Sequence, residues 1–155
     1  MADKTFTVER SRTINAPAAV VYAHIADLHA WQDWSPWENL DDHLKREYTG
    51  PRMGTGASYA WSGNRKAGEG EMVITEAVEP TSVTMSLVFT KPLKSTNQVR
   101  FIIGEHGDSC TVTWTMEGPQ TLLTRAASLF GGMEKMLGKQ FSQGLDTLAA
   151  VVEKD

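Results

Sequence analysis

The amino-acid sequence predicts an α+β fold in which a curved antiparallel sheet of six to seven strands wraps around a long C-terminal helix, with two short helices after the first strand. Several segments alternate between apolar and polar residues, as strands do when a sheet buries one face and exposes the other. After Gly118 and Pro119 the apolar period changes to about 3.6 residues, which is typical of an amphipathic helix. Only this helix is large enough to cover the inner face of such a sheet.

The strands are predicted from their alternation and from the turn residues between them. They are Thr5–Ile14, Arg46–Thr49, Ala57–Trp61, Glu69–Val78, Ser82–Thr90, Gln98–Ile103 and Cys110–Met116. Glycine, proline and asparagine occur between these segments, where turns favour them. Because threonine rows alternate with Met, Phe and Trp rows, we expect threonines on the outer face of the sheet and the large apolar residues on its inner face.

Three helices are predicted, two short and one long. Asn15 and Pro17 mark the start of the first, because asparagine can cap a helix and proline is tolerated in its first turn. The second is expected to end before Pro36, which disfavours helical geometry in the residue preceding it. The apolar stripe of the long helix runs from Leu122 to Val152. Gly131 and Gly132 interrupt this stripe, so we expect a kink or two segments there.

Arg10 and Arg12 stand out, because they fall on the more apolar face of the first strand. One of them could pair with Glu117 or with a carboxylate of a ligand. Alternatively, the first strand lies at an edge of the sheet and its inner face is partly exposed.

Composition excludes several classes of protein. The 155 residues fit one domain, residues 1–155, which is large enough to fold without a disulfide or a metal. A net charge of -4 without a basic run argues against nucleic acid as a partner. No apolar run reaches the length of a membrane span, and the N-terminus lacks the apolar segment of a signal peptide. We therefore expect a cytoplasmic protein, a monomer or weak homodimer, with no integral membrane contact.

Four short segments, in the right order, cover essentially the whole chain and carry a family likeness. They are Thr13-Ile14-Asn15-Ala16-Pro17 with Val20-Val21-Tyr22, Trp31-Gln32-Asp33-Trp34-Ser35-Pro36-Trp37, Val112-Thr113-Trp114-Thr115-Met116-Glu117-Gly118, and Gly144-Leu145-Asp146-Thr147-Leu148. With these segments the chain resembles the polyketide cyclase/dehydrase-like group of the START-related (SRPBCC) superfamily. The resemblance implies the helix-grip fold and a ligand cavity between the sheet and the C-terminal helix. It implies no universal catalytic residues, because the superfamily spans lipid carriers, hormone receptors, pollen allergens, chaperone activators and cyclases.

The residues expected to bind the ligand lie on the inner rows of the sheet, near the cavity mouth and on the long helix. They are Trp34, Trp37, Tyr59, Trp61, Met85, Phe89, Phe101, Trp114, Phe130 and Met133. Aromatic rings offer wide apolar faces to a flat ligand, and methionine adapts to varied ligands. The alternative is that such residues fill a solid core, or that Trp34 and Trp37 anchor the short helices to the sheet.

No group of residues has the spacing of a catalytic or metal site. Glu69 and Glu71 share one face of a strand, but they alternate with apolar residues and should face water. The four histidines do not converge on a metal, and the sequence has no Gly-x-Ser-x-Gly motif. Cys110 has the parity of the inner face and is expected to be a small buried hydrophobe. We therefore predict no catalytic residue, no metal ligand and no cofactor.

The sequence predicts binding of a hydrophobic or amphipathic small molecule, lipid-like or polycyclic, in the cavity. An enzyme of the cyclase/aromatase kind is the first alternative, with Tyr59, His24 and Arg10 as the groups that would orient a polyketone and move protons. The second alternative is a protein-interaction module of the co-chaperone or ribosome-associated kind, which would expose a large apolar patch.

Overall fold

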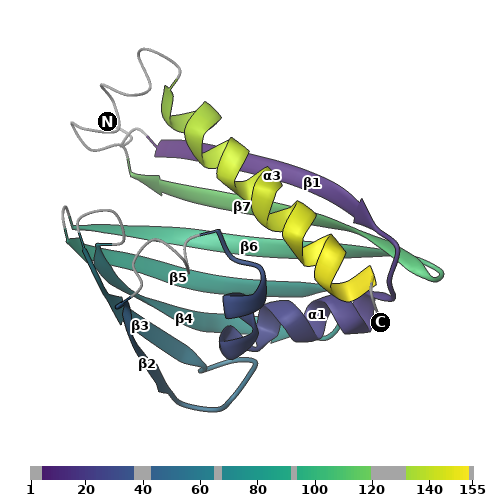
Figure 1. The fold of residues 1–155 in the computed structure, drawn as a ribbon, viewed down its shortest axis with the longest axis horizontal. Coiled ribbons are helices and arrows are strands. Elements are labelled where there is room, and N and C mark those ends of the chain that lie inside the picture. Colours follow the sequence, from purple (N-terminus) through teal and green to yellow (C-terminus); the bar gives the residue numbers. More distant parts are fainter. Residues whose placement is uncertain (1–4, 37–42, 65–67, 92–93, 120–131, 154–155) are drawn as a thin grey trace.

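The computed structural model describes residues 5–36, 43–64, 68–91, 94–119 and 132–153 (Figure 1). Along the chain its elements are β1 (Thr5–Ile14), α1 (Ala18–Ala26), the short 3-10 helix η1 (Leu28–Asp33), β2 (Lys45–Thr49), β3 (Ser58–Ser62), β4 (Glu69–Val78), β5 (Ser82–Lys91), β6 (Ser95–His106), β7 (Ser109–Pro119) and α3 (Gly132–Glu153). Each predicted strand is present, and β1 and β4 have the predicted bounds. The predicted helical stripe before α3, with its Gly131, lies outside the described residues.

The seven strands form one antiparallel sheet in the order β1-β7-β6-β5-β4-β3-β2. β1 and β2 are therefore the edge strands of the sheet. α3 runs over β1 and β7 in Figure 1, and it packs against β1 and α1. A curved sheet with a long C-terminal helix on one face is the predicted α+β arrangement, and it confirms the helix-grip fold.

Strand parity determines which residues face the interior of the fold. In β7 every second residue is buried, and the threonines between the buried positions lie on the outer face. Across that outer face the hydroxyl of Thr113 hydrogen bonds to the hydroxyl of Ser11 in β1, at 2.8 Å. The prediction that threonines face outward and large apolar residues face inward is therefore confirmed.

Arg10 and Arg12 lie on the inner face of the edge strand β1, where α3 covers them. Arg12 forms an ion pair with Asp146 of α3. Gly138 of α3 lies against the guanidinium group of Arg10, which a Cβ at this position would overlap. The expected edge position of the first strand is confirmed, and the partner of Arg12 is a helix residue instead of Glu117.

Five aromatic side chains fill the space between α3, η1 and the middle of the sheet. We call them the aromatic cluster: Trp31, Trp34, Phe101, Trp114 and Phe141, each at most 3% exposed. The rings of Trp114 and Phe141 are parallel, with centroids 4.2 Å apart, and the other ring contacts of the cluster span 4.6 to 6.1 Å. Gly144 of α3 leaves room for this contact, since a Cβ there would lie 3.0 Å from the Trp114 ring. Aromatic pairs at such distances stabilise a fold beyond their buried area alone.

Two tryptophans of the aromatic cluster also complete the end of α1. The indole Nε1 of Trp31 donates a hydrogen bond to the carbonyl oxygen of Ile25 at 2.8 Å, and that of Trp34 donates to the carbonyl oxygen of His24 at 3.0 Å. Carbonyl groups in the last turn of a helix have no N–H partner within it. Trp31 and Trp34 therefore tie the short helices to the sheet while satisfying these carbonyls.

The ring contact between α3 and the sheet should contribute strongly to stability. We expect Phe141→Ala to lower the free energy of unfolding by about 3–5 kcal/mol, because it removes a buried ring and leaves a cavity against Trp114. Gln143→Ala, on the exposed side of the same helix, should change it by less than about 0.5 kcal/mol. Urea denaturation followed by circular dichroism measures both values. Similar losses for the two variants would contradict a stabilising role for the ring contact.

Cys110 should make the free energy of unfolding depend on pH in the alkaline range. Burial, and to a smaller extent the charge of Glu105, raise the pKa of its thiol, so the folded protein keeps the thiol neutral where the unfolded chain ionises it. This contribution is complete below the unfolded pKa of about 8.5 and is lost as the pH rises above that value. The free energy of unfolding should therefore fall more steeply from about pH 8 to 10 in the wild type than in Cys110→Ala. Tyr22, whose pKa burial also raises, is common to both proteins. Parallel pH profiles in urea titrations would contradict this assignment.

Candidate functional site

Beyond the aromatic cluster, the inner face carries two rows of side chains at the end of the sheet where β5 ends and β6 begins. Cross-strand pairing defines the first row as Arg46, Trp61, Gly70, Phe89 and Ser95. The second row is Tyr48, Tyr59, Met72, Leu87 and Asn97. Residues paired in register point to the same side of a sheet, so both rows belong to the inner face.

An aromatic ladder crosses these rows from η1 to β5. It consists of His29, Tyr48, Tyr59, Trp61 and Phe89, with successive ring centroids 3.7, 5.0, 6.0 and 5.7 Å apart. The hydroxyl of Tyr48 accepts a hydrogen bond from Nε2 of Gln32 at 2.8 Å, which fixes that ring beside η1. The ladder thus links the short helix to the first two rows of the sheet.

Trp61 and Phe89 differ from the aromatic cluster in their exposure. Both are only half-buried, although they lie on the inner face of the sheet. Gly70 lies opposite both residues in the register, and a Cβ there would overlap the Trp61 indole and the carbonyl of Val88. The indole therefore lies close against the backbone of β4. Its remaining surface and the Phe89 ring, which meets it edge-on, form an accessible apolar wall.

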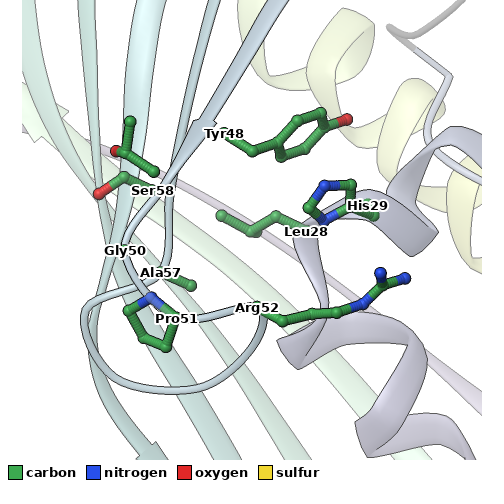
Figure 2. Close-up of a pocket in the computed structure, with 9 residues that line it drawn as sticks. Leu28, His29, Tyr48, Gly50, Pro51, Arg52, Ala57 and Ser58 are labelled. Atoms are coloured by element: carbon green, nitrogen blue, oxygen red, sulfur yellow. The ribbon is translucent and has the colours of Figure 1, made fainter.

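A hollow of about 270 Å³ lies beside the ladder, between η1 and the connection from β2 to β3 (Figure 2). The rings of His29 and Tyr48 lie next to each other at its edge, with Arg52 on the same side of the hollow. Asp27 accepts hydrogen bonds from the backbone N–H of His29 at 3.0 Å and from Nε of Arg52 at 3.2 Å. Ligand pockets usually measure about 300–1,000 Å³, so this hollow by itself accommodates only a small molecule.

The structure places the predicted ligand contacts in three groups. Tyr59, Trp61 and Phe89 come together in the first two rows, and Met85 follows in the next row of the inner face. The aromatic cluster contains Trp34, Phe101 and Trp114, which pack against one another. Trp37 and Phe130 lie outside the described residues, as does the side chain of Met133 at the start of α3. As ligand contacts, all ten residues stay predictions.

Three residues of this region were not predicted from the sequence. Tyr48 has the inward parity of its strand, which was a usable signal. Asn97 precedes the predicted start of a strand at Gln98, whereas β6 begins at Ser95, so its place on the inner face was missed. The position of His29 beside Tyr48 depends on how η1 packs against β2, and no pattern in the sequence predicts that packing.

Two kinds of feature are absent from the part of the chain that the structure describes. No three His, Cys, Asp or Glu side chains there come together as a metal site. None of the described helices is both long and apolar enough to cross a lipid bilayer.

Comparison with known proteins identifies the family. The profile of the family described as polyketide cyclase / dehydrase and lipid transport matches residues 5–153. No curated protein matches the sequence. Among solved structures, norcoclaurine synthase from Thalictrum flavum in complex with dopamine and hydroxybenzaldehyde has a TM-score of 0.69 at 11% identity, with 98% of this chain and 88% of that chain covered.

Two further structures show the same architecture. Protein CV1439 from Chromobacterium violaceum has a TM-score of 0.66 at 17% identity, with 96% of this chain and 98% of that chain covered. A protein from Thermobifida fusca, solved in solution, has a TM-score of 0.65 at 23% identity, with 92% and 90% covered. At such identities the likeness shows a shared fold and no more. The family profile spans nearly the whole chain, and the protein therefore belongs to the polyketide cyclase / dehydrase and lipid transport family.

Proposed function

We propose that the protein binds a hydrophobic or amphipathic small molecule, lipid-like or polycyclic, against the first and second rows of the inner face. The observation that carries this proposal is the half-buried pair of Trp61 and Phe89. Large aromatic rings on the inner face of a sheet are normally covered by core residues. Here they leave an apolar wall accessible, and such a wall suits a ligand with a flat or extended apolar body.

The surroundings of this wall support a binding site. Next to it in the second row lie the buried apolar side chains of Met72 and Leu87 and the buried ring of Tyr59. The aromatic cluster lies farther along the inner face and is packed, so it holds α3 in place, while Trp61 and Phe89 in the first row keep accessible surface. A rigid scaffold beside an accessible apolar wall is the usual arrangement of a preformed ligand site.

The comparisons favour the same class of ligand. The family description includes lipid transport, and the norcoclaurine synthase structure holds two small aromatic molecules, dopamine and hydroxybenzaldehyde. An interaction module would instead expose a contiguous apolar patch. The large apolar side chains that the described residues do expose, Met53, Val78, Ile102 and Met136, lie on four separate elements or connections.

Nile red, an apolar dye whose emission rises in apolar surroundings, provides a direct test. The wild type should bind it with saturable enhancement, and Trp61→Ala or Phe89→Ala should weaken binding by about ten- to a hundredfold, because each removes a ring of the apolar wall. Ile102→Ala removes a large apolar side chain from the outer face and should leave the dissociation constant unchanged. Equal effects of the inner and outer variants, or no saturable binding by the wild type, would refute the proposal.

A further inference from the structure

Asn97 is a buried polar residue in an otherwise apolar part of the inner face. It is 4% exposed, and the next inward positions of β6 are Val99, Phe101 and Ile103, all buried. Its register partner is Leu87, in the second row, which places it one row from Phe89. The apolar pattern of the surrounding residues does not explain why a polar side chain stands at this position.

The hydrogen bonds of Asn97 fix the orientation of its amide. Nδ2 donates to the carbonyl oxygen of Leu87 at 3.3 Å and lies 3.2 Å from the hydroxyl oxygen of Ser95. A backbone carbonyl can only accept a hydrogen bond, so the group facing Leu87 must be the NH₂ and not the oxygen. The position of Oδ1 is thereby determined as well.

Oδ1 receives no hydrogen bond from any residue that the structure describes. It lies against Gly118 of β7, where a Cβ would overlap it. Gly118 offers it only a Cα–H group, which is a weak donor. Oδ1 is not among the fully enclosed polar atoms that lack a partner, so the free protein leaves it some contact with solvent. A ligand that covers this oxygen without donating to it loses that contact, and a ligand that donates a hydrogen bond gains about tenfold or more in binding over an analogue that cannot.

We infer that Asn97 determines ligand specificity by accepting a hydrogen bond at Oδ1 from a hydroxyl or N–H group of the bound molecule. The inference rests on the proposed function, and it narrows the ligand to an apolar, ring-containing molecule that carries a hydrogen-bond donor. The apolar body lies against Trp61 and Phe89 in the first row, and the donor reaches Asn97 in the second. Molecules with the same body but only acceptors leave Oδ1 without a partner.

Three related probes separate the hydrogen bond from apolar contact: β-naphthol, its methyl ether and naphthalene. Only β-naphthol carries a donor, although the ether is more hydrophobic. Isothermal titration calorimetry with the wild type should show β-naphthol binding about tenfold more tightly than either of the other two. The ether controls for the oxygen atom, and naphthalene controls for the size of the substituent.

Variants assign this preference to Asn97. Asn97→Leu keeps a similar volume and should abolish the preference for β-naphthol while naphthalene still binds. Gln98→Leu is the matched control, because it removes an exposed amide from the neighbouring position, on the other face of the same strand. It should leave the preference intact. If Asn97→Leu does not fold, Gly118→Ala serves instead, since its Cβ displaces Oδ1 without removing the amide.

The outcomes distinguish this inference from the proposed function. Saturable binding of Nile red with equal affinity for all three naphthalenes, or with no binding of β-naphthol, overturns the role of Asn97 and leaves the apolar site standing. A preference for β-naphthol that persists in the folded variants overturns the role as well. Absence of binding for Nile red and for all three naphthalenes refutes both.

Discussion

The stacking of Phe141 on Trp114 is the contact on which the arrangement of helix and sheet depends. The two rings are parallel, with centroids 4.2 Å apart, and fully buried, and they join α3 to β7. Gly144 allows the helix to come this close, while Gly138 accommodates Arg10 beneath the same helix. Trp31 and Trp34 fill the space next to this contact. Their indole N–H groups donate hydrogen bonds to the last turn of α1 and so hold that helix in place.

That contact divides the inner face of the sheet into two parts of different character. Near α3 and η1 the rings touch one another on several sides and leave little exposed surface. Toward the end of the sheet where β5 meets β6, the ladder rings Trp61 and Phe89 contact each other but stay half-buried. Apolar residues of the same type and parity are therefore packed into the core in one part and keep accessible surface, the proposed binding site, in the other.

The sequence predicted the fold in detail because alternation is a local property. β1 and β4 have the predicted bounds, and the inward parity of β7 is visible in the residues themselves. Which inward residue meets which neighbour is not local. Asp146, the partner of Arg12, lies 134 positions away and comes within reach only when α3 crosses β1. The packing of Phe101 against Trp114 could not be predicted for the same reason, because it also depends on contacts between residues that are distant in the sequence.

The candidate site was predicted less completely than the fold. Tyr59, Trp61 and Phe89 could be named because they are bulky and have inward parity. Asn97 could not, because a polar residue before a predicted strand is indistinguishable from a loop residue until the register of β5 and β6 is known. Polar groups of this kind break the apolar pattern on which the prediction relies.

The separation between the aromatic cluster and the ladder has a consequence for how such a protein diversifies over evolutionary time. The stacking that seats the helix is made by Trp114 and Phe141, whereas Trp61 and Phe89 contact each other at the other end of the inner face. Descendants of one ancestor can then acquire different ligands through changes confined to one end of the sheet. Stability and ligand preference can then change independently of each other, so the same fold is kept while the sequence diverges widely.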